Sequence, residues 1–202
     1  SPLMKPLSPT PRDAAHMLEN TRQQWGGASD LWVFGYGSLI WRPEFSFAEQ
    51  RTARVHGWHR ALKMWSRVHR GSPECPGLVL GMLSGGTCQG MVFRIPQADV
   101  PAIMDKVWAR EMVMGVYDPR WVNCHTPQGP VRALAFTLSR KSPNHTGELS
   151  EADYRRIFAQ ATGRFGTTRD YARLTWEELR RLGIHDRALE RLLKFSPPPE
   201  QA

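Results

Sequence analysis

Two glycines flank a single tyrosine in the segment Phe34-Gly35-Tyr36-Gly37-Ser38-Leu39. Glycine adopts backbone conformations that let successive N–H groups face one concavity, and such a concavity binds carboxylate or phosphate oxygens. The hydroxyl group of Ser38 could add a further donor. The segment lacks the third glycine of a dinucleotide-binding loop and the Gly-Lys-Ser/Thr end of a phosphate-binding loop. A plain turn that ends a strand stays open as the alternative interpretation.

A carboxylate on the apolar side of a predicted helix is the second candidate for chemistry. Apolar residues at positions 100, 103, 104, 107 and 108 predict a helix from Val100 to about Met112. The next position of that stripe is Glu111, where a charge is costly to bury. Two explanations stay open. The carboxylate either reaches solvent or pairs with Arg110 or Arg120, or it lines a cavity where burial raises its pKa into the range useful for proton transfer.

Three cysteines offer a weaker catalytic alternative. Cys75, Cys88 and Cys124 cannot all pair with one another, and their spacing matches no metal-binding motif. We expect the three cysteines to be packing residues of a cytoplasmic protein, because thiols stay reduced in the cytoplasm. A cysteine hydrolase is disfavoured because Cys124 and His125 are adjacent, and adjacent side chains on a strand point to opposite faces. The seven histidines also lack the spacing of metal ligands.

The charge of the chain leaves a binding function open. The 202 residues include 27 Lys and Arg against 19 Asp and Glu, which gives a net charge of +8. The basic residues are scattered, so we expect a solvated basic surface, or a potential that attracts a small anionic substrate. A nucleic-acid- or protein-binding module that uses the eight tryptophans is the alternative of another class. Because the basic residues are scattered, we expect no nucleic acid as a partner. We expect no membrane partner, since no apolar run approaches about 18 residues, and we expect no signal peptide.

The elements that position these residues predict an α+β fold. A proline-rich flexible leader, residues 1–11, precedes a short helix from Asp13 to about Trp25 that ends at two glycines. Leu31–Gly35 is predicted to be a buried strand, because it is a compact apolar run that stops at glycine. Further strands are expected at Arg51–Trp58, Leu78–Met82, Gln89–Arg94, Val116–Asn123 and Val131–Leu138.

Helices are expected in the last third of the chain. Ser150–Asp153 resembles a capping box before a helix that Gly163 would end. Thr175–Glu178 resembles a second box before a helix that Gly183 would end, and Asp186 could cap a last helix. We predict one domain over residues 28–196, with the leader and short helix in residues 1–27 and a disordered tail in residues 197–202.

Four stretches resemble the ChaC family of glutathione-specific γ-glutamylcyclotransferases. Trp32–Trp41 is similar to nearly the whole opening strand and loop of that family. His69-Arg70-Gly71 resembles its H-R-G segment, Arg110-Glu111 its R-E pair, and Gly163-Arg164 with Tyr171 its G-R…Y pattern. The likeness spans roughly Leu31 to Phe195. The chain differs from the shorter members before Leu31, around Gly166–Thr168 and just after Glu111, which bears on substrate range more than on reaction type.

The resemblance implies a γ-glutamylcyclotransferase-like fold, with a small, partly closed mixed β-barrel flanked by helices, and no metal or cofactor. The implied reaction cleaves a γ-glutamyl amide and releases 5-oxoproline, and from glutathione the second product is cysteinylglycine. Other γ-glutamyl amides stay open as substrates. Glu111 is the implied general acid/base. Arg70 and Arg164 could meet a carboxylate, unless they are surface arginines. The expected substrate-binding residues are Val33, Phe34, Gly35, Tyr36, Gly37, Ser38, Leu39 and Tyr171.

Overall fold

The computed structural model describes residues 12–113 and 115–198 and divides the chain into two compact units. The first unit comprises Ser1–Arg60 and Met82–Pro143, and the second comprises Ala61–Gly81 and Asn144–Ala202. The predicted leader and residues 199–202 of the predicted tail lie outside the described residues. The single domain over residues 28–196 stays a prediction.

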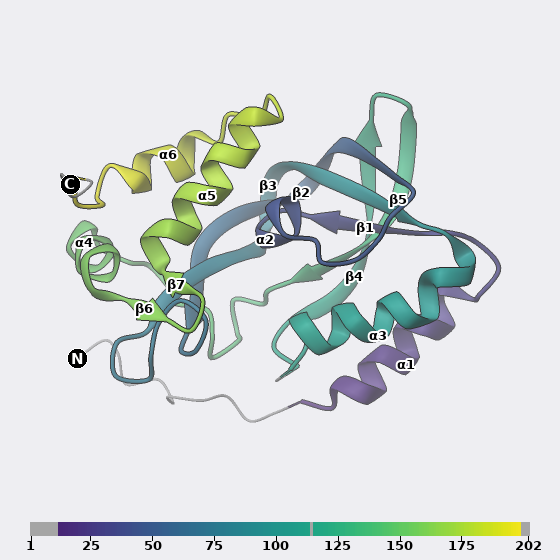
Figure 1. Cartoon of the computed structure of the whole chain (residues 1–202), viewed down its shortest axis with the longest axis horizontal. Helices are drawn as coiled ribbons and strands as arrows, with labels where there is room; N and C mark the ends of the chain where they lie inside the picture. Colours follow the sequence, from purple (N-terminus) through teal and green to yellow (C-terminus); the bar gives the residue numbers. More distant parts are fainter. Residues whose placement is uncertain (1–11, 114, 199–202) are drawn as a thin grey trace. The chain divides into compact units, whose positions relative to one another are not determined.

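A closed five-stranded barrel is the centre of the first unit, with the strand order β1-β3-β2-β4-β5 (Figure 1). β1 runs parallel to β5 and antiparallel to β3, so the barrel is mixed. These observations confirm the α+β class and the mixed barrel flanked by helices. The strands are β1 (Leu31–Gly35), β2 (Glu49–Ser66), β3 (Gly77–Ile95), β4 (Asp118–Thr126) and β5 (Gly129–Thr137).

β1 has paired neighbours on both edges, and its side chains are largely buried. Its residues pair with β3 on one side and with β5 on the other. Leu31, Val33 and Phe34 are each at most 2% exposed. A strand with both edges paired satisfies its backbone hydrogen bonds and reads as a continuous apolar run, which explains why the sequence predicted it correctly.

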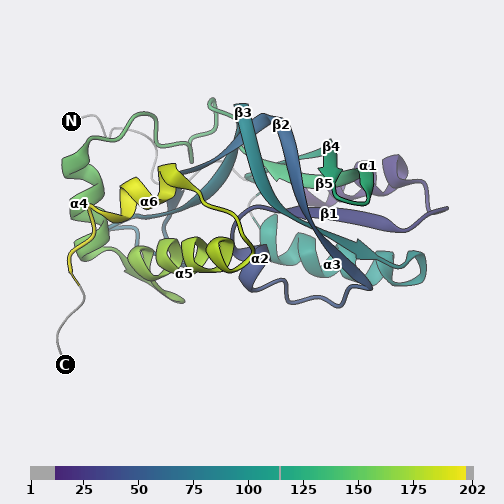
Figure 2. The ribbon, with the colours of Figure 1, turned by 90° about the horizontal axis from the view of Figure 1, so that it is seen from above.

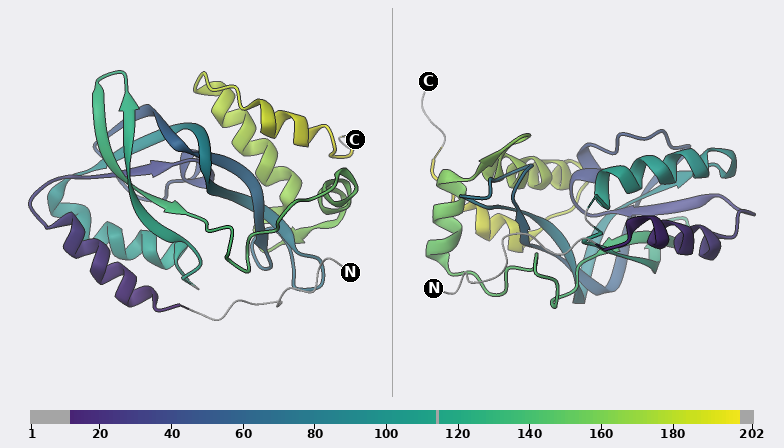
Figure 3. Two further views of the ribbon diagram at one scale, coloured as in Figure 1. Left: turned by 180° about the vertical axis from the view of Figure 1, so that it is seen from behind. Right: turned by 90° about the horizontal axis from the view of Figure 1, so that it is seen from below.

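Helices α1 (Ala14–Trp25) and α3 (Val100–Glu111) lie beside each other in the first unit (Figures 1 and 3). α3 buries the predicted apolar stripe. The indole nitrogen of Trp108 donates a 2.8 Å hydrogen bond to the carbonyl oxygen of Ala14, and Arg22 pairs with Asp105 at 2.5 Å. The short N-terminal helix is therefore packed on the helix that ends at Glu111. A one-turn helix, α2 (Ser38–Trp41), follows β1, and a 3₁₀ turn, η1 (Gln97–Asp99), precedes α3.

The prediction of two separate strands at Leu78–Met82 and Gln89–Arg94 was wrong. Both segments belong to the single strand β3. The intervening glycines suggested a turn, but Gly85 and Gly86 adopt positive φ angles inside the strand. A glycine in that conformation can bend a strand locally without ending it. The strand at Arg51–Trp58 is likewise longer than predicted.

Three helices gather in the second unit (Figure 2): α4 (Glu151–Gln160), α5 (Thr168–Arg181) and α6 (Arg187–Leu193). The capping box at Ser150 is confirmed, because Ser150 and Asp153 each bond the other's backbone N–H. The cap at Asp186 is confirmed by its bond to the N–H of Leu189. α4 ends before Gly163, which lies in the two-residue strand β6 (Thr162–Gly163) paired with β7 (Gly166–Thr167).

The predicted helix start at Thr175 was wrong. α5 begins one residue after Thr167, whose side chain accepts a 3.0 Å hydrogen bond from the N–H of Asp170. Thr175 lies in the middle of this helix, and its hydroxyl donates to the carbonyl oxygen of Tyr171. A threonine makes either kind of bond, so the local pattern alone does not distinguish a cap from a helix interior. Within residues 12–113 and 115–198, no helix combines the length and hydrophobicity of a membrane span.

Candidate active site

The glycine turn, residues Gly35–Leu39, connects the end of β1 to α2. Gly35 is closely packed, because a Cβ atom there would lie 3.1 Å from Leu39 Cβ and 3.2 Å from the Phe93 ring. The single turn of α2 is held by hydrogen bonds from the N–H groups of Ile40 and Arg42 to the carbonyl oxygens of Gly37 and Ser38. In the part of the chain that the structure describes, no hydrogen-bond acceptor is found for the N–H groups of Gly37, Ser38 and Leu39. The first N–H groups of a helix have no partner within that helix, so these three are available to a ligand.

Two other residues of the predicted substrate site are buried in the sheet. Val33 is 1% exposed and Phe34 is 0% exposed. Their side chains are packing residues of the barrel. Any contact that they make with a substrate would therefore come from the backbone where β1 ends.

The side chain of Tyr36 is directed into the barrel rather than left open at the turn. Its hydroxyl donates a 2.7 Å hydrogen bond to the carbonyl oxygen of Phe136 on β5, and the residue is 7% exposed. Its ring stacks against that of Phe34. Since a phenol has a single proton to donate, the structure favours a packing role for this side chain over donation to a substrate. Binding of substrate by Tyr36 stays a prediction.

Glu111 is the last residue of α3, and its side chain is 15% exposed. Burial raises the pKa of this carboxyl above its ordinary value, the charge of Arg110 acts in the opposite direction, and the charge of Glu44 adds to the rise. One carboxylate oxygen lies 3.4 Å from Nε of Arg110. Both explanations that the sequence left open therefore apply in part, because the Glu111 carboxylate has Arg110 as a partner and is also largely removed from solvent. Arg120 instead lies over the ring of Trp58.

Arg110 connects this carboxylate to the glycine turn. Its Nη2 donates to Oγ of Ser38 at 3.2 Å, while Nε of the same guanidinium faces Glu111. Nη1 donates to the carbonyl oxygens of Arg42 and Pro43, and it lies 3.5 Å from Glu44. A planar guanidinium with several fixed partners is a rigid spacer. The end of α3 and the glycine turn are therefore held together at one arginine.

Tyr171 belongs to the second unit. It is 5% exposed, its hydroxyl accepts a 3.0 Å hydrogen bond from the N–H of Leu80, and the guanidinium of Arg70 lies over its ring. Arg70 is itself buried and donates to the carbonyl oxygen of Thr167 at 3.4 Å, whereas Arg164 is exposed. The structure therefore gives Tyr171 and Arg70 partners within their own unit, and binding of substrate by Tyr171 stays a prediction.

Two residues that sequence reasoning did not identify also contact the glycine turn. Arg60 on β2 donates to the carbonyl oxygen of Tyr36 at 2.9 Å. Gly90 on β3 lies so close to β1 that a Cβ atom there would be 2.3 Å from the carbonyl oxygen of Gly35. Both contacts join residues more than 20 positions apart, so no local pattern could reveal them.

The cysteines are poorly placed for nucleophilic catalysis. Cys88 and Cys124 are buried, and Cys75 is partly exposed. Burial, with a smaller contribution from Cys88, raises the pKa of the Cys124 thiol to about 12. Since only the thiolate attacks, this thiol is unreactive near neutral pH. Cys124 is 0% exposed while His125 is exposed, as expected for neighbours on a strand. No cluster of metal-binding side chains occurs in residues 12–113 and 115–198.

We therefore expect alkylation to leave activity intact. Treatment of the native protein with iodoacetamide at neutral pH should modify Cys75 at most, because the other two thiols are buried. Peptide mass spectrometry would show which thiols react, and the turnover of the same sample should match that of untreated protein. If turnover stopped, and a single Cys→Ala variant that stays folded lost activity too, a cysteine nucleophile would replace Glu111 as the candidate.

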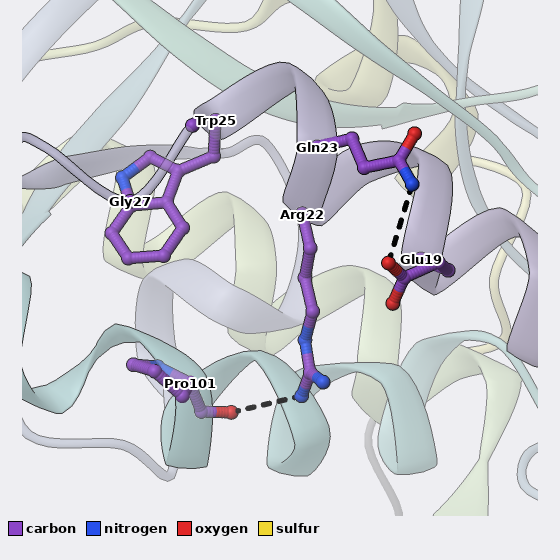
Figure 4. Close-up of a pocket in the computed structure, with 7 residues that line it drawn as sticks. Glu19, Arg22, Gln23, Trp25, Gly27 and Pro101 are labelled. Atoms are coloured by element: carbon purple, nitrogen blue, oxygen red, sulfur yellow. Dashed lines mark hydrogen bonds between the residues drawn. The ribbon is translucent and has the colours of Figure 1, made fainter.

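A surface pocket at the opposite end of α3 is unrelated to this site (Figure 4). It is lined by Glu19, Arg22, Gln23, Trp25, Gly26, Gly27 and Pro101. Figure 4 shows Arg22 reaching from α1 to the carbonyl oxygen of Pro101, to which it donates a 3.3 Å hydrogen bond. Pro101 lies in the first turn of α3 and Glu111 ends the helix. About ten residues of helix rise about 15 Å, so the pocket is remote from the carboxylate.

Comparison with known proteins identifies the family of this chain. The model of a family described as ChaC-like protein matches residues 31–196. Glutathione-specific gamma-glutamylcyclotransferase from Escherichia coli (strain K12) is 33% identical over 164 residues, which cover 81% of this chain and 71% of the relative. Glutathione-specific gamma-glutamylcyclotransferase 1 from Homo sapiens is 31% identical over 156 residues, covering 75% and 68%.

The fold also matches a solved structure. A crystal structure of a γ-glutamyl cyclotransferase specific to glutathione from yeast superimposes with a TM-score of 0.75 and covers 83% of this chain and 95% of the yeast chain. The two sequences are 20% identical in that superposition. This likeness confirms the predicted γ-glutamylcyclotransferase-like fold.

Proposed function

We propose that this chain, which belongs to the ChaC-like protein family, is a γ-glutamylcyclotransferase that cleaves glutathione into 5-oxoproline and cysteinylglycine. One observation carries the proposal. A largely buried carboxylate, Glu111, is joined through Arg110 to a turn with three N–H groups for which residues 12–113 and 115–198 provide no acceptor. The arrangement offers a proton acceptor and a binding site for negatively charged oxygen at adjoining positions. We infer glutathione as the substrate from the similarity to glutathione-specific γ-glutamylcyclotransferases.

Glu111 serves as the base and then as the acid in this proposal. The α-amine of the γ-glutamyl group is an ammonium at neutral pH and has no lone pair, so it cannot attack until a proton is removed. The carboxylate of Glu111 accepts that proton, and the free amine attacks the γ-carbonyl carbon to close a five-membered ring. The C–N bond to cysteinylglycine then breaks as the proton on Glu111 passes to the leaving nitrogen, and the ring nitrogen loses its second proton to solvent, which leaves the single N–H of the lactam. The raised pKa brings the carboxyl closer to the pKa of the amine and so favours exchange in both directions.

The glycine turn binds the oxygens of the substrate. The N–H groups of Gly37, Ser38 and Leu39 receive either the α-carboxylate or the oxyanion that develops on the γ-carbonyl oxygen. Loss of one donor to such an oxyanion typically costs ~3–4 kcal/mol of transition-state stabilisation. The nucleophile and the electrophile are parts of one molecule, so a site that folds the substrate into a ring-ready shape gains a proximity effect of ~7–11 kcal/mol.

Supporting contacts complete the proposed site. Val33, Phe34 and Gly35 place the turn at the end of β1. Tyr36 contributes to substrate binding through the backbone of the turn, since its hydroxyl bonds Phe136, and Tyr171 contributes through contacts that form with the substrate. The partner is a small molecule, with no nucleic acid, membrane, metal or cofactor required. We place the reaction in the cytoplasm, where the glutathione pool keeps thiols reduced.

Incubation with glutathione tests the proposal directly. We expect the purified protein to release 5-oxoproline and cysteinylglycine in equal amounts, measured by mass spectrometry, with no change after treatment with EDTA. A panel of other γ-glutamyl amides, γ-glutamylalanine among them, should give little product. Release of 5-oxoproline from the panel but not from glutathione would assign the alternative substrate class. An absence of 5-oxoproline from every γ-glutamyl compound would refute the proposal.

A further inference from the structure

Arg60 bonds the backbone of the glycine turn, whereas Arg110 bonds a side chain of it. Its Nη1 donates a 2.9 Å hydrogen bond to the carbonyl oxygen of Tyr36 and another 2.9 Å bond to the carbonyl oxygen of Gln89 on β3. The same nitrogen lies 3.6 Å from Sγ of Cys88. Hydrogen bonds from a charged donor are about twice as strong as those between neutral groups. The guanidinium therefore ties the turn to the strand beside it.

The bond to Tyr36 determines where the next N–H group points. The Tyr36–Gly37 peptide is trans, as are all the peptides described. In a planar trans peptide the carbonyl and the N–H point in opposite directions. With the Tyr36 carbonyl directed at Arg60, the N–H of Gly37 is directed away from it. That N–H is the first of the three without an acceptor in the described residues.

The neighbouring glycine makes this orientation easy to lose. Gly37 has no Cβ atom, so rotation of the peptide before it meets little steric resistance. A rotated peptide would present the carbonyl oxygen, which carries partial negative charge, where the N–H had been. Such an oxygen would repel a carboxylate or an oxyanion instead of binding it.

We propose that Arg60 is a positioning residue that fixes the Tyr36–Gly37 peptide in the orientation that binds a negatively charged oxygen of the substrate. It acts through the carbonyl of Tyr36 and does not touch the reacting atoms. This inference rests on the proposed function, since it concerns the same turn. A purely structural role for Arg60 would predict lower stability with unchanged binding of substrate.

The test compares Arg60→Met, which keeps an unbranched apolar stem but donates no hydrogen bond, with Arg54→Met as the matched control. Arg54 lies on the same strand and is exposed. Wild-type cleavage of glutathione is measured first, so that failure of the proposed function appears before any variant is made. We expect Arg60→Met to raise KM about 10- to 100-fold, the size of a lost hydrogen bond to a charged group. The acid limb of the pH profile, which reports Glu111, should not move.

Two further measurements separate positioning from folding. Glutaryl-cysteinylglycine lacks the α-amine and cannot cyclise, so calorimetry with this analogue measures binding alone. Its affinity should fall about 10-fold or more in Arg60→Met and stay unchanged in Arg54→Met. Arg60→Lys should recover part of the loss, and millimolar guanidinium should lower the KM of Arg60→Ala. Folded Arg60→Met with wild-type KM and wild-type affinity for the analogue would overturn the inference, as would a lowered melting temperature as the sole effect.

Discussion

Glu111→Gln should lower kcat by ~10²–10⁴-fold, the usual contribution of a general acid/base. The amide keeps the shape of the side chain and can stay beside Arg110, but it cannot take the proton from the substrate ammonium. KM should change little, because the N–H groups of the glycine turn remain in place. Steady-state kinetics with glutathione, together with circular dichroism to show that the variant is folded, measure this effect.

Asp105→Asn provides the matched control for this substitution. Asp105 is a carboxylate on the same helix, but its side chain is 63% exposed and pairs with Arg22. Removal of an exposed ion pair costs about 0–1 kcal/mol of stability and should leave turnover unchanged. If Glu111→Gln kept near-normal kcat on every γ-glutamyl substrate tested, Glu111 would be no more than the partner of Arg110.

The pH dependence carries a second signature of the same carboxyl. The base must be ionised to act, so kcat/KM of the wild type should rise with pH through the pKa of Glu111. Since burial raises this pKa, the acid limb should lie above the ordinary range of a glutamate. In Glu111→Gln the residual activity should lack this limb. A wild-type limb at the ordinary pKa of an exposed glutamate would contradict the burial seen in the structure.

Stability should respond to pH in the opposite sense to activity. The pKa of Glu111 is higher in the folded state than in the unfolded chain, so the folded state binds this proton more tightly. The contribution of the group to the free energy of unfolding is therefore full below the ordinary pKa and is lost as pH rises through the raised value. Glutamine does not titrate, so urea unfolding should show Glu111→Gln gaining stability over the wild type as pH rises from ~4 to ~8.

The sequence predicted well those features that depend on neighbours along the chain. The apolar stripe of α3 predicted that Glu111 lies on the core-facing side of the helix. The glycines of the turn were recognised because they come directly after a predicted buried strand. Ser150 and Asp186 were correctly identified as helix caps, since each bonds an N–H group three residues away, and the short helix predicted from Asp13 begins at that residue's cap. Periodicity and capping are local, so one sequence suffices to recognise them.

Features that depend on distant neighbours were missed or misjudged. Gly85 and Gly86 take positive φ angles within β3 without ending it, and whether a strand continues past such glycines depends on its pairing with other strands. The hydroxyl of Tyr36 bonds Phe136, 100 residues away, and so serves the barrel. The part played by Arg60 depends on a carbonyl oxygen 24 residues away in the chain. The local residue pattern does not indicate any of these partners, so packing rather than sequence spacing decides the role of each residue.

Gly90→Ala should reduce kcat/KM by about 10²-fold, the loss that a displacement of about 1 Å in a catalytic site can cause. The new Cβ atom would lie 2.3 Å from the carbonyl oxygen of Gly35 and 3.0 Å from the ring of Phe34. A backbone oxygen cannot rotate away as a flexible side chain could, so β1 and the start of the glycine turn must shift. Overpacking of this kind also costs about 1–3 kcal/mol of stability.

Gly57→Ala separates displacement of the turn from loss of stability. Gly57 lies on β2 with a φ of +86°, and a Cβ atom there would meet no atom within 4 Å. Alanine at that position costs about 1 kcal/mol through backbone strain alone and touches nothing near the turn. Both variants should therefore unfold at lower urea concentration, but only Gly90→Ala should lose activity per folded molecule. If the two variants retained equal kcat/KM, the close approach of β3 to Gly35 would have no part in shaping the glycine turn for catalysis.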